Sequence, residues 1–132
     1  MKLPALLFVS GLLACTTSAA VDFTIRSADF KPAATIGTAQ VYQGYGCTGK
    51  NMPPEVSWQG VPAGTRSFAL TLFDPDANAG KGWWHWLVID IPATTQALPT
   101  GGKLPQGALT LRNDFGEADY GGPCPPSGDP PH

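Results

Sequence analysis

One histidine, His85, stands within the most aromatic stretch of the chain, Gly82 to Pro92 (GWWHWLVIDIP). Three of the four tryptophans surround it. Aromatic side chains at this density normally build a core, whereas an imidazole can donate or accept a hydrogen bond and can carry a positive charge. His85 is therefore either a satisfied core residue or the polar group of a cavity.

Two carboxylates, Asp74 and Asp76, lie just upstream of this histidine. Asp74 ends one apolar stretch and His85 begins the next, so neighbouring strands would bring both side chains to the same end of a sheet. A carboxylate orients an imidazole and favours its protonated form. Such an imidazole can bind an anion, and we expect Gly121 and Gly122 to add backbone N–H donors.

Metal binding and covalent catalysis are less consistent with the sequence. His85, His132, Asp74 and Asp76 are suitable ligand types, but their spacing matches no compact metal motif. No serine has a nucleophile-elbow context, and Cys124 lies between two prolines. We therefore predict no metal, no cofactor and no enzymatic activity.

A Gly-x-Gly-x-x-Gly pattern occurs at Gly44, Gly46 and Gly49. A dinucleotide-binding fingerprint must open a helix, and here Pro53 and Pro54 follow almost at once. The pattern is interpreted as a turn.

The composition limits the possible partners. The net charge is −2 and charged residues make up 14% of the chain. This composition does not indicate a protein that binds nucleic acid or one with a polybasic surface for membranes. The 16 glycines and 14 prolines stand between apolar runs. A loop-rich β protein of one domain is predicted.

Alternation of apolar and polar residues predicts strands and no sustained helix. The stretch 84–91 is apolar on both faces in its middle, so we expect it at the centre of a sheet. The predicted strands cover residues 21–25, 39–42, 55–58, 67–73, 84–91 and 109–111.

The N-terminal segment reads as an export signal. Residues 1–20 contain a lysine, an apolar run too short to span a bilayer and small residues before Val21. A lipoprotein signal over residues 1–14, with lipidation at Cys15, is the alternative, and a buried N-terminal helix is a third. The folded domain then spans residues 21–132, in the periplasm or outside the cell, with membrane contact only through lipidated Cys15.

The cysteines support this location. Removal of the leader leaves Cys47 and Cys124, an even pair in an oxidising compartment. A Cys47–Cys124 disulfide is predicted, with two buried free thiols as the alternative.

Several motifs together resemble one known family. They are CTGKNMPPEVSW, then DPDA, GWWHW, and finally GGPCPPSGDPPH. Across residues 22–132 the chain resembles the phosphatidylethanolamine-binding protein family, in particular its bacterial Raf-kinase-inhibitor-like branch. The resemblance implies a mainly β fold with few peripheral helices and a small pocket for phosphate, acetate or a phospholipid head group. The pocket residues that it implies are Asp74, Asp76, His85, Gly122, Pro123 and His132.

The sequence departs from the family pattern at two places. Asn78 stands where the family usually has proline, so a less rigid loop is expected before His85. Family members also continue, past the histidine that corresponds to His132, with a further strand and a C-terminal helix. We therefore expect the C-terminal strand and helix to be missing, and the 132 residues to fold less stably and bind anions more weakly than a longer version.

The function that the sequence favours is an exported, non-enzymatic protein that binds a small anion. The alternatives are a protein-interaction module that regulates a kinase or protease, since the family includes such regulators, and a non-functional fragment.

Overall fold

Residues 22–129 are described by a computed structural model, in which they form short strands and a single helical turn. The strands are β1 (Thr24–Arg26), β2 (Gln43–Gly44), β3 (Cys47–Thr48), β4 (Val56–Gln59), β5 (Ser67–Asp74), β6 (Trp83–Pro92), β7 (Ala97–Leu98) and β8 (Leu109–Thr110). The helical turn, α1, covers Ala77–Gly80, and its residues Asn78 and Ala79 have positive φ. The prediction of a mainly β fold is confirmed.

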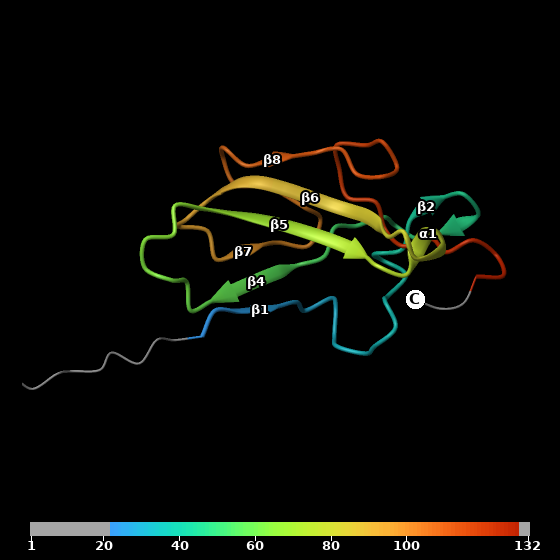
Figure 1. The fold of residues 1–132 in the computed structure, drawn as a ribbon, viewed down its shortest axis with the longest axis horizontal. Helices are drawn as coiled ribbons and strands as arrows, with labels where there is room; N and C mark the ends of the chain where they lie inside the picture. The colour runs from blue at the N-terminus through green and yellow to red at the C-terminus, as the bar shows by residue number, and fades with distance from the viewer. Residues whose placement is uncertain (1–21, 130–132) are drawn as a thin grey trace, which may run out of the picture.

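Two antiparallel sheets make up the body of the molecule (Figure 1). One has the strand order β1-β4-β7 and the other β5-β6-β8, while β2 and β3 form a separate hairpin. The longest strand, β6, has a neighbour on each side, which confirms the expected central position of residues 84–91. Towards one end, β5 and β6 approach α1, the β2–β3 hairpin and the C-terminal segment.

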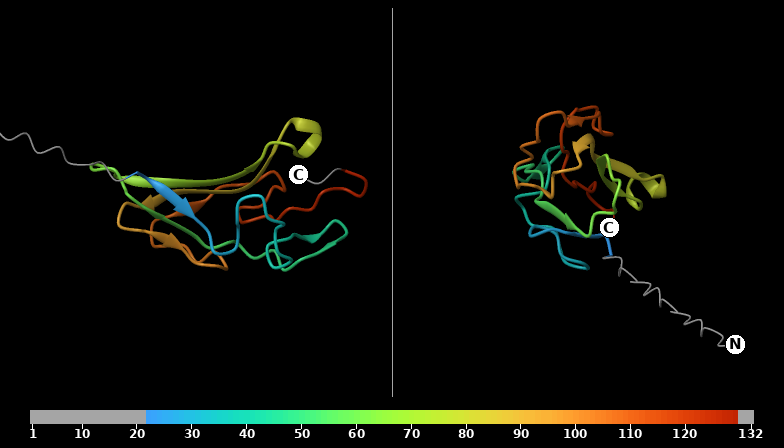
Figure 2. Two further views of the ribbon diagram at one scale, coloured as in Figure 1. Left: turned by 90° about the horizontal axis from the view of Figure 1, so that it is seen from below. Right: turned by 90° about the vertical axis from the view of Figure 1, so that its left-hand side faces the viewer.

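The core lies between the two sheets, which face each other (Figure 2). The largest fully buried side chain, Trp86 of β6, is 2% exposed and meets the ring of Tyr120 edge-on at 5.8 Å. Val56 and Trp58 of β4 face this layer from the other sheet. We call this apolar part of the molecule the sheet body.

The pairing of β5 with β6 contains two irregularities. Phe68 pairs with Ile91 and Leu70 with Val88, so the extra residue lies on β6. The same is true at His85, which falls between the partners of Leu72 and Phe73. β5 keeps a regular alternation, with residues 68, 70, 72 and 74 half-buried and the others exposed.

The strand predictions need correction in two respects. Residues 39–42 form turns rather than a strand, and the short β2 follows them. β3 and β7 were missed, because two residues cannot show an alternating pattern. The glycine pattern at residues 44–49 opens no helix, as expected, and forms the β2–β3 hairpin.

The predicted leader, over residues 1–20 or 1–14, lies outside the described residues, and so does Cys15. Among residues 22–129 no helix has the length and apolar character needed to cross a membrane. That part of the chain also holds no group of three or more His, Cys, Asp or Glu side chains placed to bind a metal.

Candidate functional site

A cavity of about 520 Å³ opens where β5 and β6 meet α1 and the C-terminal segment. We call this part of the molecule the cavity end. Strands supply only a minority of its lining, and α1 and loops supply the rest. The lining residues are Tyr45, Asp74, Ala77, Asn78, Trp83, His85, Asp114, Phe115, Pro123, Cys124, Pro125, Pro126 and Asp129.

The strand pairing brings Asp74 and His85 to the same cavity, as the sequence predicted. Asp74 is the last residue of β5 and pairs with Trp83, two residues before His85. Both side chains line the cavity. A direct hydrogen bond between them stays a prediction.

His85 is buried and locked to the segment that follows Tyr120. Its Nδ1 lies 2.6 Å from the carbonyl oxygen of Gly121, and the amide of Gly121 donates to the carbonyl oxygen of His85 at 2.9 Å. A carbonyl can only accept, so Nδ1 carries the proton. His85 therefore has a fixed tautomer and ring orientation, and any ligand it contacts must be met by Nε2 or by the ring carbons.

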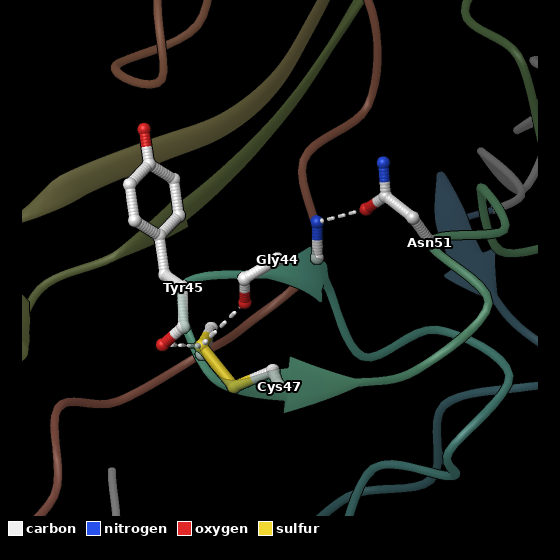
Figure 3. Close-up of a disulfide and its surroundings, with 6 residues drawn as sticks. Gly44, Tyr45, Cys47 and Asn51 are labelled. Atoms are coloured by element: carbon white, nitrogen blue, oxygen red, sulfur yellow. Dashed lines mark hydrogen bonds between the residues drawn. A yellow bond between two sulfur atoms is a disulfide. The ribbon is translucent and has the colours of Figure 1, made fainter.

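Asn51 also holds this segment in place, and Figure 3 shows the hydrogen bond that its side chain accepts. Its Nδ2 donates to the carbonyl oxygen of Tyr120 at 3.0 Å, and its Oδ1 accepts from the amide of Gly122 at 2.7 Å. Asn51 itself has φ +50°, a left-handed conformation that asparagine tolerates better than most residues.

The amides of Gly121 and Gly122 are thus both used within the protein. The prediction that they donate to a ligand is wrong for this structure, because His85 and Asn51 already accept them. The glycines serve close packing instead. A Cβ atom at Gly122 would lie 2.0 Å from the carbonyl oxygen of Gln40. Any other residue at this position would therefore require the backbone to move.

Asn113 organises the turn that carries two lining residues, Asp114 and Phe115. It is 4% exposed, and its Nδ2 donates to the carbonyl oxygen of Asp119 at 2.9 Å. Its Oδ1 accepts from the amide of Glu117 at 3.1 Å. Asp114 is tied to β6 through Trp84, whose amide donates to Asp114 Oδ2 at 2.7 Å.

The predicted disulfide is confirmed. Cys47 and Cys124 are bonded, with their Cα atoms 6.0 Å apart. The Sγ atom of Cys124 also touches the carbonyl oxygens of Gly44 and Tyr45, at 3.6 and 3.9 Å (Figure 3). Because a disulfide sulfur carries no proton, these are packing contacts. The bond joins the β2–β3 hairpin to the cavity wall.

Stacked aromatic rings form one side of the cavity. Phe115 lies parallel to Tyr42, with ring centroids 4.4 Å apart, and meets Trp83 edge-on at 5.2 Å. Tyr45 covers the outside of the stack and is 82% exposed. Burial, followed by the nearby Glu117 carboxylate, raises the pKa of Tyr42 above its ordinary value, so this ring stays neutral at physiological pH.

Asp74 also shapes the loop before His85. Its Oδ1 accepts from the amides of Asp76 and Ala77, at 3.0 and 3.2 Å. Asp76 is exposed at the start of α1 and is not among the lining residues, so the structure does not support its predicted ligand contact. Asn78 has φ +52°, a conformation that proline cannot adopt.

The remaining predicted site residues divide into two groups. Pro123 lines the cavity, as expected. His132 lies outside the described residues, and its role stays a prediction. Sequence reasoning missed Tyr45, Asp114, Phe115 and Asp129 as lining residues, and it missed Asn51 and Asn113 as anchors. The only available signal was that all six lie in stretches rich in glycine, proline, asparagine and aspartate, which are typical of turns.

Comparison with known proteins gives the same picture as the fold and the motifs. Residues 26–132 match the phosphatidylethanolamine-binding protein family. The chain is 49% identical to the UPF0098 protein YbcL of Escherichia coli K12, over 96% of this chain and 73% of that protein. It is 47% identical to YbhB of the same organism, over 67% of this chain and 60% of that protein. A putative lipoprotein of Mycobacterium tuberculosis, LppC, is 36% identical over 86% of this chain and 53% of its own length.

Solved structures agree. The crystal structure of Escherichia coli YbcL, described as a new member of the mammalian PEBP family, superposes with a TM-score of 0.78 at 49% identity. The match covers 83% of this chain and 71% of that one. The putative phosphatidylethanolamine-binding protein homologue CT736 of Chlamydia trachomatis gives a TM-score of 0.65 at 25% identity, over 80% of this chain and 67% of that one. The chain belongs to the phosphatidylethanolamine-binding protein family.

Proposed function

We propose that this chain is an exported, non-enzymatic binding protein whose cavity holds a small ligand with a phosphate-type group, free or as a phospholipid head group. One observation carries the proposal: a buried imidazole, 6% exposed, lines the cavity with its tautomer fixed by the Gly121 carbonyl. A polar group held in one orientation against an apolar wall is the usual plan of a small-molecule site.

The fixed tautomer sets how His85 would bind. Since Nδ1 donates to Gly121, a neutral ring presents an acceptor at Nε2, and only the imidazolium presents a donor there. An anionic oxygen would therefore be held by protonated His85, and a ligand hydroxyl by the neutral ring. Asp74 lies on the same cavity wall.

The charge of the lining narrows the ligand further. Three carboxylates, Asp74, Asp114 and Asp129, line the cavity, and no lysine or arginine lines it among the described residues. A doubly charged anion would be repelled, because like charges at close range disfavour each other. A singly charged phosphate ester fits better, and a zwitterion with an ammonium group near Asp114 or Asp129 fits best.

The lining supports binding rather than covalent catalysis. It contains no serine, threonine or lysine among the described residues, and Cys124 is oxidised in the disulfide. Of the usual covalent nucleophiles that leaves carboxylates, the Tyr45 hydroxyl and His85, whose Nδ1 is already engaged.

Two observations support export. The Cys47–Cys124 disulfide suits an oxidising compartment, and one relative carries the name of a lipoprotein. Both agree with the leader-like sequence of residues 1–20.

Titrations of inorganic phosphate and of O-phosphoethanolamine test the proposal, followed by tryptophan fluorescence and by phosphorus NMR. We expect His85→Ala to abolish binding of both. Asp129→Asn should strengthen phosphate binding, by about two- to fivefold, because it removes a like charge from the cavity. Lys103→Ala, at a residue that does not line the cavity, is the control and should change nothing. Unchanged affinity in a folded His85→Ala variant would refute the proposal.

A second candidate function is a protein-interaction module, and the exposed ring of Tyr45 favours it. Tyrosine is enriched at the centres of protein interfaces. A protein partner that docks on this ring would lose affinity with Tyr45→Ala and keep it with His85→Ala, whereas a cavity ligand should lose affinity with His85→Ala.

A further inference from the structure

Tyr45 holds a backbone conformation that its side chain disfavours. Tyr45 and Gly46 form the two-residue turn of the β2–β3 hairpin, with φ +51° and +91°. Positive φ at both central residues is typical of a type I′ turn, which favours asparagine followed by glycine, whereas a bulky aromatic residue in this conformation is an outlier. Strain of this kind persists where the surrounding structure imposes it, and it is frequent at ligand-binding sites. The strained turn therefore marks Tyr45 as a candidate functional residue.

The structure around the turn holds the Tyr45 ring beside the cavity. Figure 3 shows this ring standing out from the turn, with the Cys47–Cys124 disulfide on the strand that follows. On the preceding strand the ring of Tyr42 packs against Gly44, where an added Cβ atom would lie 2.9 Å from the ring. Tyr45 stacks on Tyr42, with ring centroids 5.7 Å apart and 24° between the ring planes. The disulfide and this stack together fix the position of the Tyr45 ring.

The ring that is fixed in this way stays uncovered. Tyr45 is 82% exposed, although it lines the cavity and has a neighbouring ring on one face. The face of an aromatic ring carries the negative part of its quadrupole and attracts cations. The cavity adds to this attraction, because its lining includes the carboxylates Asp74, Asp114 and Asp129 and, among the described residues, no lysine or arginine. A cationic group beside Tyr45 therefore meets both the ring and a negative field.

We propose that Tyr45 is a ligand contact, positioned by the disulfide, which gives the cavity a preference for a quaternary ammonium group such as that of choline. This role rests on the proposed function, in which the phosphate-type group of the ligand lies at His85. A primary ammonium is strongly hydrated, and a ring face replaces its hydrogen bonds to water poorly. A quaternary ammonium donates no hydrogen bond and loses little water on the ring. The exposed ring of Tyr45 therefore selects the methylated cation over the primary one.

Titrations of O-phosphocholine and O-phosphoethanolamine, followed by tryptophan fluorescence and phosphorus NMR, test the proposal. The two probes differ only in the methyl groups on nitrogen, so the ratio of their affinities isolates the ammonium contact. The wild type should bind O-phosphocholine about two- to fivefold more tightly. Tyr45→Asn should bring the ratio to about one, and Tyr45→Phe should keep it, because phenylalanine retains the ring. Since asparagine suits the positive φ, Tyr45→Asn should melt no lower than the wild type.

Cys47→Ser with Cys124→Ser tests the role of the disulfide. The affinity ratio should again fall to about one, and adding Tyr45→Asn should change it no further, because the bond acts through the ring. Circular dichroism would establish that the variants fold. Equal affinity of the wild type for both probes, or a wild-type ratio in folded Tyr45→Asn or in the folded protein without the disulfide, would each overturn the proposal. A wild type that binds neither these probes nor inorganic phosphate would instead refute the proposed function itself.

Discussion

In the sheet body the buried groups are apolar and come from strands, whereas at the cavity end they are largely polar and come from loops. Trp86, Val88 and Ile91 pack between the sheets without using their side chains for hydrogen bonds to fixed partners. Asn51 holds two backbone groups of a distant segment, and Asn113 holds two backbone groups of its own turn. The stability of the sheet body depends on the apolar volume that it buries, and that of the cavity end depends on the direction of its hydrogen bonds.

This difference determines what each region can tolerate. An apolar core accepts substitutions that keep its volume, because dispersion contacts have no preferred angle. The hydrogen-bonded cavity end accepts few substitutions, because a lost hydrogen bond leaves a buried polar group without a partner. Tyr120 belongs to both regions. Its ring packs on Trp86, its hydroxyl donates to the carbonyl oxygen of Gln40 at 2.8 Å, and its own carbonyl accepts from Asn51.

The largest effect should come from emptying the sheet body. We expect Trp86→Ala to lower the free energy of unfolding by about 3–5 kcal/mol, since it removes the largest fully buried side chain and leaves a cavity. Urea denaturation measures the loss.

Trp84→Ala is the matched control, on the same strand. Trp84 is 38% exposed and packs on Phe73, so its removal should cost less than about 1.5 kcal/mol. Equal losses for the two variants would show that the core does not lie where the structure places it.

An intermediate effect should come from the cavity end. Asn51→Ala removes the partners of the Tyr120 carbonyl and the Gly122 amide, so we expect a loss of about 2–4 kcal/mol and weaker ligand binding. Asn51→Ala could destabilise the fold through its lost hydrogen bonds or through the strain of alanine at a positive φ, and Asn78→Ala separates these two causes. Asn78 has nearly the same positive φ, is exposed and makes no side-chain hydrogen bond within residues 22–129. A loss as large in Asn78→Ala would assign the whole effect to backbone strain.

The smallest effect at neutral pH, and the most informative, concerns Tyr120. Tyr120→Phe should cost about 1–2 kcal/mol, since it leaves the Gln40 carbonyl unpaired. Burial, with a lesser contribution from the Asp29 carboxylate, raises the pKa of the Tyr120 hydroxyl above its ordinary value of 10.0. The neutral hydroxyl therefore stabilises the fold fully below about pH 10, and this contribution is lost progressively as the pH rises beyond it.

Thermal melts between pH 8 and about 11.5 check this sign. The difference in melting temperature between wild type and Tyr120→Phe should be constant up to about pH 10 and should become smaller above it. Tyr45→Phe, which alters an exposed hydroxyl, should melt like the wild type at neutral pH. A gap that widens in alkali would mean that the hydroxyl is ionised in the folded state.

The sheet body could be predicted from the sequence because its pattern is local. Alternation over residues 67–73 and an apolar run over 84–91 identified β5 and β6, and the position of His85 followed from where β6 begins. The resemblance to the family predicted the cavity, and the even number of cysteines after the leader predicted the disulfide. Strands of two residues, such as β7, leave no such pattern.

The cavity end could be predicted only in part, because long-range hydrogen bonds leave no local signal. Asn51 stands in a loop and resembles any turn-forming asparagine, yet its two partners lie about 70 residues further along the chain. The amides of Gly121 and Gly122 looked available for a ligand, and only the positions of Asn51 and His85 show that they are not.

The disulfide between Cys47 and Cys124 turns the chain between them into a covalent ring. Strands β4 to β8 and the exposed α1 loop all lie inside it. A protease that cuts once near Asn78 would therefore release no fragment. The product would keep its full mass plus one water and would separate into two pieces only after reduction, so a nicked protein would pass for an intact one on a non-reducing gel.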